Sequence, residues 1–138
     1  MPIAQSTLNL TCTTEGCSAI ADAVASEKKV TFSSLHFYTD TSLDPQSTTY
    51  SDLANYTAIL TMSPLQVVID STSTPNTVKI SGFYSGQFGD GSLSYNIHTV
   101  AMCGSYNGNN ILVALDSRTV SDTIYSLQGN GNIAIDGL

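Results

Sequence analysis

Histidine is the side chain best suited to acid–base chemistry near neutral pH, and the sequence has two, His36 and His98. His36 stands in the largely apolar run 35–38, which alternates like a strand, and we interpret it as a half-buried structural residue. His98 precedes Cys103 by five positions. Side chains at that spacing point to opposite faces of a regular strand, so this pair cannot share a metal ion or act as nucleophile and base.

The three cysteines, Cys12, Cys17 and Cys103, offer little chemistry by their number and spacing. An odd count argues against a disulfide framework. Cys12 and Cys17 are too far apart for a CxxC redox pair, and their spacing is unusual for zinc ligands. We therefore expect three small, buried, apolar groups.

Carboxylates provide the last candidates for catalysis or metal binding. Asp40 and Asp44 could form an acid–base pair, but their Ser/Thr-rich surroundings favour exposed turn residues. Asp90, in "FGDGSLSYN", is a single carboxylate and would make only a weak calcium site. The motifs GxSxG, HExxH and GxxxxGKS are absent. We predict a protein that is not an enzyme and needs no cofactor or metal.

Tyrosine is the commonest aromatic residue, with 7 copies, and several lie in or beside predicted loops. Tyrosine rings next to asparagine can stack on sugars and hydrogen-bond to them, and they are also enriched at protein interfaces. The candidate contact residues for a glycan or a protein partner are Tyr50, Tyr56, Tyr106, Asn107 and Asn109.

The first half of the chain predicts one helix followed by one strand. Thr13 or Thr14 is placed to cap an Ala-rich helix over residues 15–28. Three- and four-residue spacing indicates that one narrow stripe of this helix faces a core: Cys17, Ile20, Ala21, Val24 and Lys28. Residues 28–40 then alternate as a strand that places His36 and Tyr38 on one face.

The second half is rich in predicted strands. A turn-rich loop over 40–52 and a short helical turn at 50–56 precede strands at 56–64 and 65–72, which Pro64 separates. Further elements are a turn at 71–76, a strand at 77–86, a glycine-rich loop at 86–91, a hairpin at 97–115, a loop at 116–131 and a last strand at 132–138.

The hairpin is apolar on both faces, so we expect it at the centre of a sheet, joined by the turn "GSYNGNN". The sequence predicts an α+β fold that is mainly antiparallel β-sheet, with one N-terminal Ala-rich helix packed on it. The length of 138 residues suits a single domain over residues 1–138.

Charge limits the possible partners. Charged residues make up only 11% of the chain, and the formal net charge is −7. We expect no nucleic acid as partner, because phosphate binding depends on basic residues and only four are present: Lys28, Lys29, Lys79 and Arg118. No apolar run is long enough to predict membrane insertion, and the first ten residues lack the features of a signal peptide.

The order of elements resembles the amino-terminal domain of phage tail-collar fibre and baseplate fibre proteins. "LTCTTEGCSAIADAVASEKKVTFSSLHFYTD" matches the opening of that family, and "YSDLANYTAILTMSPLQVVIDSTSTPNTVKISGFYS" matches its middle. "NIHTVAMCGSYNGNNILVALDSRT" matches its signature, with 97–104 under "IREIGLYA" and 110–115 under "LIAVA". Thr99 and Ala101 replace the family's Glu and Gly, and 38–40 replaces its "GDG" turn.

The resemblance implies a structural virion component that attaches a tail fibre or receptor-binding protein to the phage baseplate. It also implies other baseplate or tail proteins as partners, a homotrimer, and a location in the phage tail. The alternative is a carbohydrate-binding module that recognises a host cell-surface glycan through its tyrosine-containing loops. A hydrolase is the third hypothesis and rests only on the scattered carboxylates and the two histidines.

Overall fold

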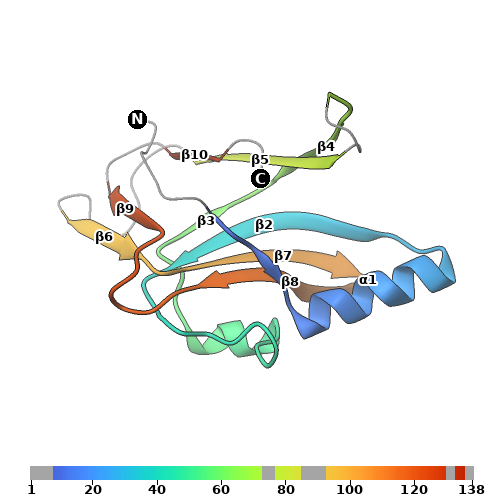
Figure 1. The fold of residues 1–138 in the computed structure, drawn as a ribbon, viewed down its shortest axis with the longest axis horizontal. Coiled ribbons are helices and arrows are strands. Elements are labelled where there is room, and N and C mark those ends of the chain that lie inside the picture. Colours follow the sequence, from blue (N-terminus) through green and yellow to red (C-terminus); the bar gives the residue numbers. More distant parts are fainter. Residues whose placement is uncertain (1–7, 73–76, 85–92, 130–132, 136–138) are drawn as a thin grey trace.

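The protein is built around one five-stranded antiparallel sheet with smaller sheets on one side of it (Figure 1). The computed structural model describes residues 8–72, 77–84, 93–129 and 133–135. The strands of the main sheet, in spatial order, are β1 (Thr11–Cys12), β8 (Asn109–Ser117), β7 (Thr99–Tyr106), β2 (Val30–Tyr38) and β3 (Leu60–Met62). The predicted α+β, mainly antiparallel fold is confirmed.

The β7–β8 hairpin lies at the centre of this sheet, as its apolar pattern predicts. Residues 99–104 and 111–116 are all buried. The turn is shorter than the expected "GSYNGNN", because Tyr106 already pairs with Asn109. Only Asn107 and Gly108 lie between the strands, with φ of 52° and 80°. Two central residues with positive φ match the two-residue turn that follows the natural twist of a hairpin.

Helix α1 (Thr14–Ser26) begins at the predicted place. The side chain of Thr13 accepts a hydrogen bond from the Gly16 amide at 2.9 Å and donates one to the Leu112 carbonyl at 2.5 Å. One hydroxyl therefore caps the helix and joins it to β8.

Replacing Thr13 with alanine is expected to lower the free energy of unfolding by about 2 kcal/mol, because the helix cap and a buried hydrogen bond are lost together. Thr14→Ala is the matched control, since Thr14 is exposed and does not cap the helix. Urea denaturation followed by circular dichroism measures both. Equal losses in the two variants would contradict the assigned cap.

The predicted inward face of α1 is wrong. All five residues of the expected stripe are exposed: Cys17, Ile20, Ala21, Val24 and Lys28. The buried face consists of Gly16, Ala19 and Ala23. A Cβ atom on Gly16 would lie 2.1 Å from the Val113 carbonyl oxygen. The helix therefore approaches the backbone of β8 so closely that small residues are needed on that face, and the larger apolar ones point outward.

Two smaller sheets adjoin the main sheet: one lies over one of its faces, and the other lies at its left end in the view of Figure 1. One has the order β10 (Ile133–Ile135), β5 (Thr77–Tyr84), β4 (Gln66–Asp70), and the other pairs β6 (Ser94–Ile97) with β9 (Tyr125–Gln128). Strand β9 lies in the segment predicted as a loop. Its sequence is too short to predict a strand, and its pairing with β6 stabilises the extended conformation. The expected loop at 86–91 and part of the turn at 71–76 lie outside the described residues.

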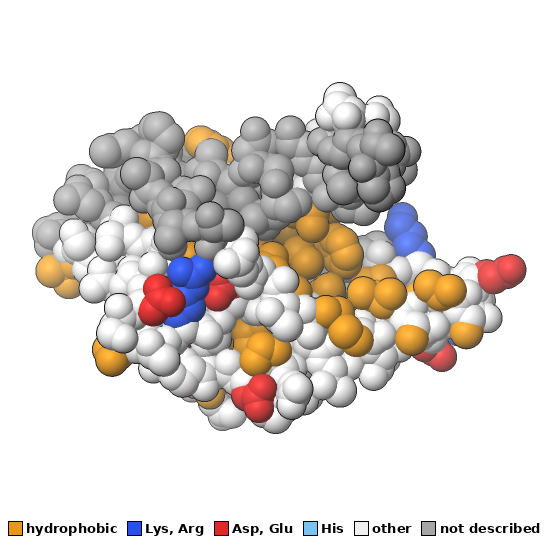
Figure 2. All heavy atoms as spheres, in the orientation of Figure 1, with side chains coloured by type: hydrophobic (Ala, Val, Ile, Leu, Met, Phe, Trp, Pro, Cys, Tyr) orange, Lys and Arg blue, Asp and Glu red, His pale blue; other side chains and the backbone are white. Residues whose placement is uncertain are grey.

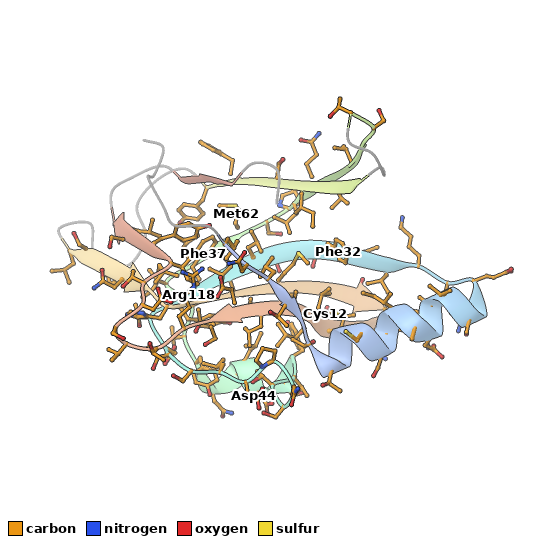
Figure 3. The ribbon with its side chains drawn as sticks, in the orientation of Figure 1. Cys12, Phe32, Phe37, Asp44, Met62 and Arg118 are labelled. Carbon is orange, nitrogen blue, oxygen red and sulfur yellow. The ribbon has the colours of Figure 1, made fainter. Side chains whose placement is uncertain are left out.

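Apolar side chains form two clusters. The larger one includes Leu35, Phe37 and Met62. In Figure 3, Phe37 and Met62 lie on the side of the smaller sheets. The other includes Tyr38, Leu53 and Leu112, and the half-buried Tyr50 and Tyr56 pack against it. The 3₁₀ helix η1 (Ser51–Asn55), which confirms the predicted helical turn, covers this second cluster. Within the described residues, no helix is long and apolar enough to cross a membrane.

Candidate functional site

The five residues predicted to contact a glycan or a partner lie in two separate places. Tyr50 and Tyr56 flank η1 and line one cavity. Tyr106, Asn107 and Asn109 lie at the tip of the β7–β8 hairpin and are not part of that cavity. The sequence alone does not predict that these five residues separate into two places, because the cavity forms only where β2 and η1 meet.

The cavity has a volume of about 550 Å³, within the range of small-ligand pockets. Strand β2 supplies two of its side chains, and η1 with its flanking residues supplies the others. The lining residues are His36, Tyr38, Tyr50, Ser51, Leu53, Ala54, Tyr56 and Ala58. The cavity thus combines three phenol rings and an imidazole with small or aliphatic neighbours, and the described residues that line it include no carboxylate, lysine or arginine.

The aromatic rings of the cavity contact one another. His36 stacks with Tyr38 at a centroid distance of 6.4 Å and an interplanar angle of 12°. Tyr56 meets Tyr38 edge-on, at 6.3 Å and 75°. Tyr38 is only 3% exposed, and burial, followed by the nearby Cys103, raises the pKa of its phenol well above the ordinary value. Tyr38 therefore forms an uncharged part of the floor at neutral pH.

His36 is held by hydroxyl groups. Its Nε2 atom lies 2.9 Å from Ser34 Oγ, and its Nδ1 atom lies 3.4 Å from Thr61 Oγ1. Burial lowers its pKa, so the imidazole is neutral at pH 7. Since neither of these hydrogen-bond partners is a carboxylate, the arrangement differs from the oriented, acid-backed histidine of a hydrolase triad.

One side chain distant in the sequence, Glu15, fixes the position of Tyr50. Its Oε1 atom accepts hydrogen bonds from the Tyr50 amide at 2.9 Å and from the Leu112 amide at 2.6 Å. The carboxylate therefore joins α1, the central strand β8 and the wall of the cavity. The sequence does not reveal this role of Glu15, because contacts across 97 positions leave no local pattern.

At the hairpin tip, the predicted contact residues are engaged within the chain. Tyr106 donates a hydrogen bond to Asp22, which also raises the pKa of the phenol. Lys28 Nζ lies 3.5 Å from Asn107 Oδ1. The first contact connects the hairpin to α1 and the second connects it to the segment after α1, so they account for Tyr106 and Asn107 without a ligand. Asn109 is exposed.

The other residues considered for catalysis or metal binding either form hydrogen bonds within the fold or lie apart from one another. His98 is 6% exposed, and its Nδ1 atom lies 2.9 Å from the Asp122 carbonyl oxygen. Asp44 accepts a hydrogen bond from the Gln46 amide within an exposed turn, as predicted. The Asp40 carbonyl oxygen accepts one from Thr99 Oγ1. Asp90 lies outside the described residues.

The expectation of three buried cysteines is wrong for two of them. Cys103 is buried, and burial raises the pKa of its thiol to about 12. Cys12 and Cys17 are exposed, because the edge strand β1 and the outer face of α1 present them. Although Cys12 is exposed, partial desolvation of its sulfur, followed by a hydrogen bond to Cys17, raises the pKa of its thiol to about 11, so the thiol stays protonated at neutral pH. No group of three or more potential metal ligands occurs in the described part of the chain.

Comparisons with protein-family models, with curated proteins and with solved structures found no match.

Proposed function

We propose that the protein is a structural component of a phage tail, where it attaches a fibre or receptor-binding protein to the baseplate. The resemblance to tail-collar and baseplate fibre proteins supports this role. The burial of the most apolar segments, in β7 and β8, within the protein interior supports it too. The observation that carries it is the apolar surface that the described residues leave uncovered on one projecting arm.

This arm consists of β4 and β5, which form the outer part of one of the small sheets (Figure 1). Among the described strands, β4 lies at the edge of its sheet and pairs with β5 alone. Val67 and Val68 are 42% and 44% exposed, and as neighbours in a strand they point to opposite faces. Phe83 on β5 is 60% exposed. An edge with apolar side chains on both faces is a template for pairing with another chain.

A second uncovered apolar surface follows α1. Figure 2 shows a row of apolar side chains over this helix. Ile20 and Val24 are 38% and 77% exposed. Together with the arm, this surface gives the domain two regions for contact with neighbouring subunits. We propose the arm for contact between copies in a homotrimer and the helix for contact with other baseplate or tail proteins.

Replacing Val68 with aspartate is expected to weaken self-association at least tenfold, because a carboxylate would lose its water at the subunit contact without a counter-charge. Val120→Asp is the matched control, since Val120 is 80% exposed outside the arm. Light scattering over a range of concentrations gives the mass of each variant, and circular dichroism checks its fold. A strict monomer that binds no baseplate protein would overturn the proposed role.

Carbohydrate recognition is the second candidate function, because Tyr50 and Tyr56 line one cavity together with Tyr38. In this role the protein would also be part of the phage tail, and it would contact a host glycan directly. A glycan array tests it in general, since any sugar-specific signal would identify the protein as a lectin.

A further inference from the structure

We propose that the cavity between β2 and η1 binds an uncharged sugar residue of a cell-surface glycan. The inference rests on the second candidate function and gives it a place and a ligand class. It concerns the cavity alone, so it is independent of the β4–β5 arm and of the proposed assembly.

The ring faces in the cavity favour a sugar. Pyranose rings present C–H groups on one face, and these pack against aromatic rings, whose faces carry partial negative charge. Tyr50 and Tyr56 are half-buried at the wall, so each is held in place while part of it stays accessible. The edge-on contact of Tyr56 with the floor residue Tyr38 and the Glu15 hydrogen bond to the Tyr50 amide fix the two ends of η1. Such preorganisation reduces the entropy lost on binding.

The charges around the cavity select against an acidic sugar. None of the basic residues whose side chains the structure describes lines the cavity: Lys28, Lys29 and Arg118. His36 is neutral at pH 7 because burial lowers its pKa. An anionic sugar would therefore lose water without gaining a cation, in a protein whose net charge is already −7. Sialic and uronic acids are thus disfavoured, and neutral sugars are not.

Polar groups at the cavity suit hydroxyl-bearing ligands. Ser51 is exposed at the start of η1 and offers a hydroxyl that can donate and accept. Phenol groups have the same double capacity. A few such groups among apolar walls are the usual composition of a small-ligand site. The volume of about 550 Å³ accommodates a small ligand such as a terminal sugar residue with part of its neighbour.

Saturation-transfer NMR with methyl glycosides of glucose, galactose and N-acetylglucosamine, and with N-acetylneuraminic acid, tests the proposal on the full chain. We expect at least one neutral glycoside to bind and the acidic sugar not to bind. Ala54→Trp fills the cavity from an exposed position on η1 and is expected to weaken binding at least tenfold. Tyr56→Ala should have a similar effect, and Tyr106→Ala, at the hairpin tip, should have none.

Three results would overturn the inference: no neutral glycoside binds the wild-type chain, the acidic sugar binds better, or Ala54→Trp binds as well as the wild type. Binding that is lost in Tyr106→Ala and kept in Ala54→Trp would move sugar recognition to the hairpin tip, so the inference would fail while the second candidate function survived. A peptide that contains Leu or Phe is tested in the same way. If this peptide shows saturation transfer and no sugar does, the inference is overturned and the cavity is identified as a protein-docking site. Circular dichroism of Ala54→Trp checks that this variant is folded.

Discussion

Gly104→Ala is expected to lower the free energy of unfolding by about 3 kcal/mol, the upper end of the usual cost of overpacking. A Cβ atom at this position would lie 1.8 Å from the Thr31 carbonyl oxygen. That oxygen belongs to the backbone of β2, beside a register shift between Phe32 and Ser34, so no side-chain rotation can relieve the clash. Strands β2 and β7 would have to move apart. Urea denaturation of the purified variant measures the loss.

Gly108→Asn is the control for this substitution. Gly108 has a φ of 80° at the hairpin turn, and a Cβ atom there would meet nothing within 4 Å. Asparagine tolerates positive φ better than other side chains, so the expected cost is small. If Gly104→Ala were as stable as Gly108→Asn, the close approach of β2 to β7 would be refuted.

Phe37→Ala is expected to cost about 4 kcal/mol, within the range for removing a buried aromatic ring. Phe37 is fully buried, and its ring centroid lies 5.9 Å from that of Tyr125 on β9. The side chain lies between the main sheet and the smaller sheets, close to Met62 (Figure 3). Its loss would leave a cavity where three sheets meet. Thermal and urea unfolding measure the change.

Tyr125→Phe is the matched control, because it keeps the ring and removes only a hydroxyl. That hydroxyl is buried and has no hydrogen-bond partner among the described residues. An unsatisfied buried hydroxyl costs about 1–3 kcal/mol, so we expect this variant to be as stable as the wild type or more stable. A large loss in Tyr125→Phe, or a negligible one in Phe37→Ala, would show that the contact between β2 and β9 is misplaced.

The fold class and the central hairpin could be predicted because their signals are local and repeated. The run 97–103, apolar apart from His98 and Thr99, and the fully apolar run 111–115 require cover on both faces, and both are buried in the structure. The inward face of α1 could not be predicted from hydrophobicity. The helix meets the backbone of β8 through Gly16, and such a close approach selects for small side chains over apolar ones.

The candidate site was predictable only in part. Strand alternation places His36 and Tyr38 on one face, and loop position singles out Tyr50 and Tyr56. What joins these pairs is the packing of η1 over the second apolar cluster, through the buried Leu53. The role of Glu15 depends on hydrogen bonds to two distant backbone amides. Only a folded chain reveals either contact.

Cryo-electron microscopy of the phage tail to which we assign this chain tests the central claim most directly. The proposal predicts density for this domain where the fibre meets the baseplate, with three copies around the fibre axis. It also predicts that β4 contacts a neighbouring copy and that the exposed side of α1 faces a baseplate protein. Assembled, fibre-bearing particles that lack the domain would contradict the proposed function.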